Sequence, residues 1–229
     1  MDQEKMWEVL QNEENFTDNF SEARQRYMVS RLTKGSSVLN IGVGSGALER
    51  LGSDRGITMH SLDPSETAIE RLRKELDMKE RAQTGYAQSM PFADGSFDAV
   101  VISEVIEHLE PTIMHASFDE IKRVLRSGGV VVISTPFNEK LSDGKVVCPG
   151  CGKQFHRMGH VQSFDKSRLA DILKQHRFTN AKIKITTFVD WKRSGIINFV
   201  KSTLRLALAK MGQQIAVPHL FAVATKPKL

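Results

Sequence analysis

The chain has 229 residues, of which 40% are hydrophobic and 26% are charged, and its formal net charge is +5. This composition is ordinary for a soluble globular protein and excludes a disordered chain, a collagen-like fibre and a coiled coil. No run approaches the roughly 18 consecutive apolar residues of a membrane span. The amino-terminal stretch is acidic and polar, unlike a secretory signal, so a cytoplasmic location is the default expectation. The modest positive net charge is too small to indicate a nucleic-acid-binding protein.

Apolar residues at helical spacings predict a helical cap over residues 1–34. From Ser36 onward, short β-branched runs alternate with longer amphipathic runs. The predicted strands are 38–41, 57–62, 97–102, 130–134, 181–189 and 220–225, and the predicted helices are 46–51, 65–76, 113–125 and 165–176, the last capped by Asp165. This alternation predicts a doubly wound α/β domain over residues 35–229, with helices on both faces of a mostly parallel sheet. In such folds the ligand binds beyond the carboxyl ends of the strands.

Two segments interrupt this alternation. Residues 137–163 form a long insertion that contains both cysteines of the chain. Residues 192–212 place apolar side chains on one side of a predicted lid-like helix. We expect this helix to pack on the domain, with a substrate lid, a dimer face and a membrane-surface contact as alternatives.

The stretch VLNIGVGSG at residues 38–46 runs from a predicted strand into a predicted helix. Its glycines permit a tight turn and a close approach of the backbone to a ligand. The next strand ends at Asp63, 17 positions beyond Gly46. A carboxylate there can accept hydrogen bonds from both hydroxyls of a ribose. The alternative is that Asp63 only caps the following helix.

Several motifs together resemble the class I S-adenosylmethionine-dependent methyltransferases. VLNIGVGSG looks like their first motif and SLDPSE, at 61–66, like their acidic second motif. MPFADGSFDAVVISEVIEHL, at 90–109, looks like the segment around their fourth strand, and LRSGGVVVIST and LFAVATKP look like their fifth and last strands. The resemblance implies a seven-stranded, mostly parallel sheet and S-adenosylmethionine as cofactor. It assigns the cofactor loop to Gly42, Gly44 and Gly46, the ribose contact to Asp63, and the methionine end to Ser103.

Two positions depart from the family pattern. The family commonly has a carboxylate where this chain has Asn40, which can still accept a hydrogen bond through its side-chain oxygen. It often has aspartate at the position of Tyr86, facing the adenine. Tyr86 could stack or hydrogen-bond there, or Gln88 could take the role, and we expect a contact from the backbone amide of Ala87.

Glu104, Glu107 and His108 follow the fourth predicted strand. On a helix these side chains share one face, and two carboxylates with an imidazole can hold a divalent ion. The E-x-x-E-H arrangement resembles that of metal-dependent O-methyltransferases of the ubiquinone-pathway and small-RNA types. The alternative is that Glu107 and His108 only hold the loop together.

The insertion contains a second candidate metal site. Cys148, Cys151, His156 and His160 have the spacing C-x2-C-x4-H-x3-H, and two thiolates with two imidazoles satisfy tetrahedral zinc. We interpret this set as a structural zinc clip, with a redox dithiol and unligated cysteines as alternatives. His160 has a competing assignment, because the resemblance places a histidine at this point in the active site.

The sequence therefore predicts methyl transfer from S-adenosylmethionine to a small-molecule or glycan-type acceptor, with oxygen as the expected acceptor atom. The catalytic candidates are Glu104, His108 and His160. One alternative is an RNA 2′-O-methyltransferase that uses the E-x-x-E-H metal, although no basic strip interleaved with aromatic residues is evident. The other is a cofactor-binding or zinc-binding adaptor without activity on the same fold.

Overall fold

The computed structural model of the protein describes residues 20–189 and 196–228. Most of the predicted amino-terminal cap, residues 1–19, lies outside the described residues. The first residues of the predicted lid-like helix, 192–195, do so as well.

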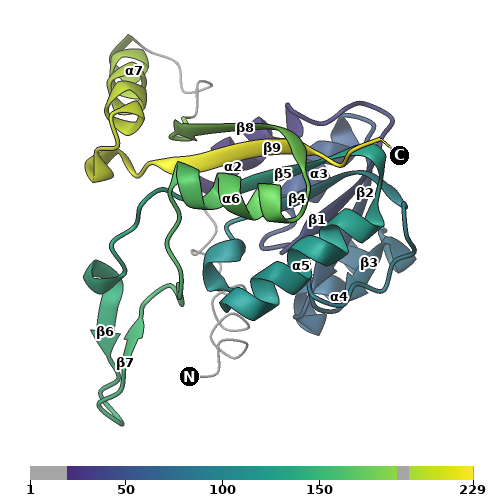
Figure 1. Ribbon diagram of the computed structural model, residues 1–229, viewed down its shortest axis with the longest axis horizontal. Coiled ribbons are helices and arrows are strands. Elements are labelled where there is room, and N and C mark those ends of the chain that lie inside the picture. Colours follow the sequence, from purple (N-terminus) through teal and green to yellow (C-terminus); the bar gives the residue numbers. More distant parts are fainter. Residues whose placement is uncertain (1–19, 190–195, 229) are drawn as a thin grey trace.

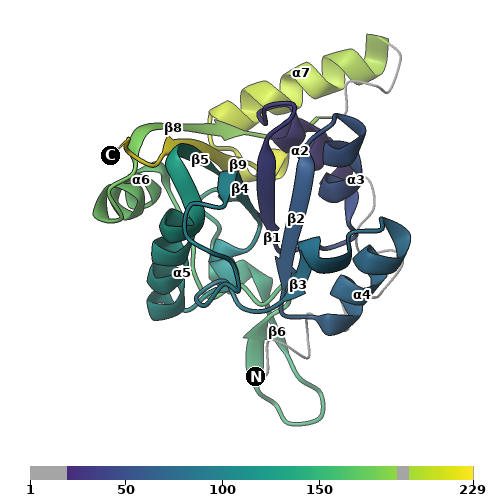
Figure 2. The same ribbon diagram turned by 90° about the vertical axis from the view of Figure 1, so that its right-hand side faces the viewer.

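Seven strands form one sheet in the order β3-β2-β1-β4-β5-β9-β8 (Figures 1 and 2). The central strands β1 (Ser37–Ile41), β2 (Thr58–Asp63), β4 (Phe97–Ser103) and β5 (Leu125–Pro136) run parallel. The predicted doubly wound, mostly parallel seven-stranded sheet is confirmed. Because β1 pairs with both β2 and β4, the strand order reverses there, and the carboxyl end of β1 is the expected place for a ligand.

The outer strands differ more from the sequence prediction. The edge strand β3 (Ala82–Thr84) was not predicted, because three residues are too few to show a hydrophobic period. On the other side of the sheet lie β8 (Thr179–Thr186) and β9 (His219–Thr225). β9 runs antiparallel to both β5 and β8. The amino end of β9 therefore lies at the same edge of the sheet as the carboxyl ends of the parallel strands.

Alternating side chains along the strands build two separate cores. In β1, Leu39 belongs to the core on one face and Val38 to the core on the other. The helices α5 (Pro111–Val124) and α6 (Lys166–Gln175) cover the first face (Figure 1). The second face is covered by α2 (Phe20–Val29), α3 (Ala47–Asp54) and α4 (Glu66–Glu75).

Local capping defines where two of these helices begin. Asp165 caps α6 as predicted, because its side chain accepts a hydrogen bond of 2.8 Å from the backbone amide of Arg168. Asp63 is not the cap of α4. Ser65 is, since its side chain accepts from the amide of Ala68 at 3.2 Å. The capping alternative for Asp63 was therefore wrong.

We expect Ser65→Ala to lower the free energy of unfolding by about 1 kcal/mol, the usual effect of losing a side-chain cap. Urea denaturation of both proteins measures this difference. Ser65→Asp, which restores an acceptor at the cap, should recover most of the loss. An alanine variant as stable as the parent would contradict the capping role.

The insertion forms a separate small hairpin. After the 3-10 helix η3 (Leu141–Gly144), strands β6 (Lys145–Val147) and β7 (Gln154–His156) pair antiparallel. Both views show this hairpin projecting from the body of the domain (Figures 1 and 2).

The helix α7 (Ile196–Lys210) lies away from the hairpin, beside the end of the sheet formed by β8 and β9 (Figure 1). Over the ranges 20–189 and 196–228, no helix is both long and apolar enough to cross a bilayer.

Candidate active site

A tight glycine loop joins β1 to α3. Gly42 and Gly46 have positive φ angles of 83° and 76°, which favour glycine. A Cβ atom on Gly42 would lie 2.7 Å from a methyl group of Val105, and one on Gly46 would lie 2.5 Å from a methyl group of Leu72. Neither position has room for a side chain, whereas a Cβ atom on Gly44 would meet nothing within 4 Å. The loop backbone lies at the carboxyl end of β1, where the fold predicts a ligand.

Asp63 at the end of β2 connects this loop to the following turn. Its carboxylate accepts hydrogen bonds of 2.9 Å from the amides of Val43 and Ser65, one on each oxygen. The residue is 1% exposed. A carboxylate oxygen can accept two hydrogen bonds, so the same oxygens can also accept from ribose hydroxyls.

The structure reveals a carboxylate beside the glycine loop that was not predicted. The side-chain amide of Asn40 donates to Glu49 Oε1 at 2.7 Å, and the hydroxyl of Ser61 donates to the same oxygen at 2.7 Å. Glu49 is fully buried and its Oε2 has no hydrogen-bond partner among the described residues. Burial raises the pKa of the Glu49 carboxyl. An acidic group is thus present next to position 40, supplied by α3 instead of β1.

The other predicted cofactor contacts lie at the same edge of the sheet. Tyr86, Ala87 and Gln88 follow β3, in a turn closed by a hydrogen bond of 3.0 Å from the Ser89 amide to the Tyr86 carbonyl. Tyr86 is 45% exposed and Ala87 is buried. Ser103 ends β4, with its hydroxyl 2.9 Å from that of Ser134. The fold therefore brings the nine predicted cofactor residues to the carboxyl ends of four neighbouring strands.

The segment after β4 does not continue as the predicted helix. Glu104 has a left-handed backbone with a φ of 56°, and only Ile106–His108 form a short 3-10 helix, η2. Glu104 and Glu107 consequently do not share a helix face. The prediction of one three-residue metal face formed by Glu104, Glu107 and His108 was wrong in this respect.

Glu104 is instead held by a histidine, an arginine and a hydroxyl. Its Oε2 lies 3.3 Å from His219 Nε2 and 4.0 Å from an Arg24 guanidinium nitrogen, and its Oε1 accepts from the hydroxyl of Ser134 at 2.7 Å. Burial opposes ionisation, but His219, Arg24 and the hydrogen bonds outweigh it and lower the pKa of the Glu104 carboxyl. Glu104 is therefore an anion at neutral pH.

Glu107 and His108 are more deeply buried, and their surroundings oppose ionisation. Glu107 Oε2 accepts from the hydroxyl of Thr135 at 3.0 Å, while its Oε1 is buried without a hydrogen-bond partner in the described parts of the chain. Burial and the charge of Glu104 raise the pKa of the Glu107 carboxyl well above its usual value. Burial lowers the pKa of His108 to about 3, so this ring is neutral at pH 7.

The insertion brings His160 to this site. The ring centroids of His160 and His108 are 4.6 Å apart, and His160 Nδ1 hydrogen-bonds to the carboxylate of Glu139. One ligand atom from each of Glu107, His108 and His160 lies within 4.8 Å of the other two. The sequence left two locations open for His160, the zinc clip and the active site. In the structure His160 lies beside His108 in the Glu104–His108 segment.

These three side chains have the surroundings of metal ligands. A metal-binding histidine usually donates its other ring N–H to a carboxylate or a carbonyl. His160 donates to Glu139, and His108 donates to the backbone carbonyl of Gly159. The unsatisfied Oε1 of Glu107 completes a set of two imidazoles and one carboxylate, which suits a divalent transition metal.

A neighbouring group of three side chains is less suitable as a metal site. Glu139, His156 and His160 also have ligand atoms within 4.8 Å of one another. However, His156 Nδ1 accepts hydrogen bonds from the amides of Met158 and His160 at 3.3 and 3.2 Å. The ring proton is then on Nε2, the nitrogen that faces Glu139 at 3.5 Å, and a protonated nitrogen cannot bind a metal.

The predicted zinc set is not brought together. Cys148 and Cys151 lie in the turn at the tip of the hairpin, whereas His156 pairs with Lys145 at its base. Cys148 bonds through its amide to Lys153, three strand positions or about 10 Å before His156. Cys148, Cys151, His156 and His160 therefore cannot share one ion within a single chain, and this part of the prediction is corrected.

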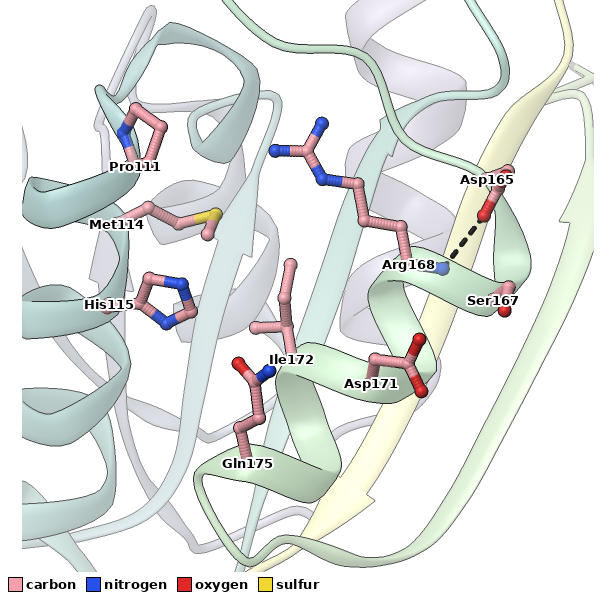
Figure 3. A pocket seen from close by; sticks show the side chains of 9 residues that line it. All are labelled: Pro111, Met114, His115, Asp165, Ser167, Arg168, Asp171, Ile172 and Gln175. Atoms are coloured by element: carbon pink, nitrogen blue, oxygen red, sulfur yellow. Dashed lines mark hydrogen bonds between the residues drawn. The ribbon is translucent and has the colours of Figure 1, made fainter.

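A groove of about 420 Å³ lies between α5 and α6. Figure 3 shows the residues that line it, which are Pro111, Met114, His115, Asp165, Ser167, Arg168, Asp171, Ile172 and Gln175. His115 also connects the two helices, because its Nδ1 lies 3.0 Å from Nε2 of His176. No residue of the glycine loop or of the Glu104–His108 segment lines this groove, so we do not assign it to the cofactor.

The comparison with known families agrees with this geometry. Residues 39–133 match the family described as "Methyltransferase domain", a segment that runs from β1 through the glycine loop to β5. The chain carries a class I S-adenosylmethionine-dependent methyltransferase domain. The resemblance inferred from the motifs is confirmed.

Relatives of this methyltransferase domain act on different acceptors. It is 38% identical over 106 residues to a demethylmenaquinone methyltransferase of Beutenbergia cavernae, covering 44% of this chain and 42% of that protein. It is 34% identical over 105 residues to phosphoethanolamine N-methyltransferase 2 of Caenorhabditis elegans, covering 44% and 24%. The matched segment spans less than half the length of either relative.

Solved structures with the same fold align with most of the chain. A methyltransferase from Archaeoglobus fulgidus superposes with a TM-score of 0.65 and 18% identity, covering 99% of this chain and all of that one. A chain of the Haloferax volcanii complex between the Trm112 methyltransferase activator and a methyltransferase gives 0.69 and 17%, with 99% of each chain covered. Phosphoethanolamine N-methyltransferase 2 of Haemonchus contortus, solved with S-adenosyl-L-methionine, gives 0.63 and 20%, covering 97% and 56%.

Proposed function

We propose that this methyltransferase transfers the methyl group of S-adenosylmethionine to a hydroxyl of a small-molecule or glycan-type acceptor. The observation that carries the proposal is the cluster of two carboxylates and two imidazoles, Glu104, Glu107, His108 and His160, at the carboxyl ends of β4 and β5 beside the glycine loop. Amines and thiolates need little help as nucleophiles, whereas a hydroxyl benefits from a proton acceptor or a metal ion.

The cofactor half of the proposal rests on the strand ends. Gly42, Gly44 and Gly46 form the loop that lies against the cofactor, and Asp63 holds its ribose. The cofactor supplies an activated methyl group on a positively charged sulfur, so the protein mainly has to align the two reactants and exclude water.

The acceptor half rests on the segment after β4. With a pKa of about 3, His108 is too weak a base to be an efficient proton acceptor at pH 7, but its neutral ring is suited to bind a metal. Glu107, His108 and His160 would hold a divalent ion, which would lower the pKa of a bound hydroxyl. Glu104 stays outside that ligand set because it is paired with His219 and Arg24.

The experiment combines an acceptor screen with one substitution. Small-molecule and glycan extracts are incubated with methyl-labelled S-adenosylmethionine, and fragmentation by mass spectrometry locates the methyl group in each product. We expect an O-methyl product, a turnover number at least about 100-fold lower for His108→Asn, and cofactor affinity within about two-fold of the parent. His115→Asn, which changes a histidine of the α5–α6 groove, serves as the matched control and should retain turnover.

Two results would contradict the proposal in different ways. An N-methyl or S-methyl product would overturn the acceptor atom and leave methyl transfer intact. Tight cofactor binding without any labelled product would favour the adaptor without activity. Metal binding is tested separately by calorimetric titration with Mn²⁺ and Zn²⁺, which His160→Gln should weaken.

A further inference from the structure

The tip of the β6–β7 hairpin holds the two cysteines of the 229-residue sequence in one tight turn. Hydrogen bonding to the backbone of Cys151 and Gly150 and to the side chain of Cys151 lowers the pKa of the Cys148 thiol. The carbonyl of Cys148 accepts from the amide of Gly152 at 2.8 Å, which closes the turn. Backbone amides directed at a sulfur stabilise its thiolate form, and the thiolate is the form that binds metals.

This turn provides half of a zinc site. Structural zinc takes four ligands, almost always from cysteine and histidine. The chain has no further cysteine, and all seven of its histidines are among the described residues. Within the ranges that the structure describes, neither cysteine belongs to a group of three or more metal-ligating side chains. A four-ligand zinc site at this turn therefore needs two ligands that the described residues do not supply.

We propose that two copies of the chain join at their hairpin tips through one shared zinc ion, held by Cys148 and Cys151 of each copy. A two-fold axis through the ion brings the same pair of thiolates from both sides and completes a four-cysteine set. The inference goes beyond methyl transfer and does not depend on it.

The exposed side chains at the tip of the hairpin are consistent with contact to a second copy of the chain. Cys151 is exposed and Cys148 is half-buried. The two valines that precede the turn in β6 are also exposed, Val147 to 59% and Val146 to 38%. A second hairpin packed against the first would cover these apolar side chains. The hairpin projects from the body of the domain, so two tips can meet before the domains do (Figure 1).

The test measures metal content and mass on the full chain under reducing conditions. Parent protein and the Cys148→Ser/Cys151→Ser double variant are loaded with Zn²⁺, dialysed and analysed by elemental analysis and light scattering. We expect the parent to be a dimer and to hold about one zinc more for every two chains than the double variant. The double variant should be monomeric, and a chelator should convert the parent to monomer. Bound Co²⁺ should show the absorption of a tetrahedral thiolate site in the parent only.

A matched control lies at the other end of the same hairpin. His156→Gln changes a buried histidine at the base and should retain both the dimer and its zinc. Loss of zinc from a monomer on His156→Gln would favour a clip within one chain and overturn the proposal. A monomeric parent with the same zinc content as the double variant would overturn it too. So would a dimer that survives both cysteine substitutions.

Discussion

Replacing Asp63 with alanine is expected to weaken the binding of S-adenosylmethionine and of its demethylated product by about 100-fold or more. The Asp63 carboxylate would accept hydrogen bonds from two ribose hydroxyls, and a hydrogen bond to a charged group contributes roughly 1.5–3 kcal/mol. The same carboxylate accepts from the Val43 amide, so its loss also loosens the glycine loop. Isothermal titration calorimetry with both ligands measures the change.

Two variants make this result specific. Asp63→Asn keeps an acceptor oxygen but not the charge, and should fall between the parent and the alanine variant. Asp98→Ala is the matched control, because Asp98 also accepts a hydrogen bond from a backbone amide, that of Ser37, at the opposite edge of the sheet. It should lower stability and leave cofactor affinity unchanged. Equal affinity of the Asp63→Ala variant and the parent would show that the ribose is held elsewhere.

The fold could be predicted because its signals are local and repeated. The alternation of β-branched and amphipathic runs identifies the parallel core, and an acidic residue before an apolar run identified the cap at Asp165. The α5–β5 junction shows the limit of local signals. The predicted helix 113–125 and strand 130–134 leave residues 126–129 between elements, yet β5 begins at Leu125 and includes them. The register of β5 on β4 shifts across these residues, and the amide of Gly128 donates to the carbonyl of Lys226, just after β9. Such long-range pairing leaves no signal in the local sequence.

The positions of the proposed cofactor residues could be predicted from the sequence, and those of the groups around Glu104 could not, for a topological reason. The proposed cofactor residues follow consecutive parallel strands, so their positions follow from chain order alone. Arg24 and His219, which hold Glu104, come from α2 and from the antiparallel strand β9. A residue at the start of β9 reaches this edge only because β9 runs opposite to its neighbours. The order of the strands along the chain does not indicate that β9 runs antiparallel.

The cysteines and histidines of the insertion show how spacing can mislead. The pattern C-x2-C-x4-H-x3-H fits four zinc ligands if the segment is a compact loop. Residues 154–156 instead form a strand that pairs with 145–147. Because the strand is extended, His156 lies away from the tip of the hairpin. His160 contacts Glu139 and His108 instead of the cysteines. The secondary structure of a short insertion determines which side chains come together. A strand of three residues leaves too weak a pattern in the sequence to be predicted.

Removal of the Glu49 charge is expected to change how stability depends on pH. Burial raises the pKa of Glu49 above its usual value of 4.5, so the folded state retains a proton that the unfolded chain has lost. Below the unfolded pKa both states are protonated and the carboxyl has no cost. As the pH rises from there to the folded pKa, the parent loses about 1.4 kcal/mol for each unit by which the pKa is raised.

Glu49→Gln cannot ionise and should escape this loss while its side-chain oxygen still accepts from Asn40 and Ser61. The free energy of unfolding of the variant minus that of the parent should therefore increase between pH 4.5 and 8, as measured by urea denaturation without cofactor. Glu70→Gln, on the exposed face of α4, controls for the removal of a surface carboxyl and should not reproduce the trend. A difference that is constant with pH, or that decreases, would mean that the carboxyl is ionised at no cost. In that case Asn40 and Ser61 would stabilise a permanent anion beside the glycine loop, and the loop would present a fixed negative charge to the cofactor.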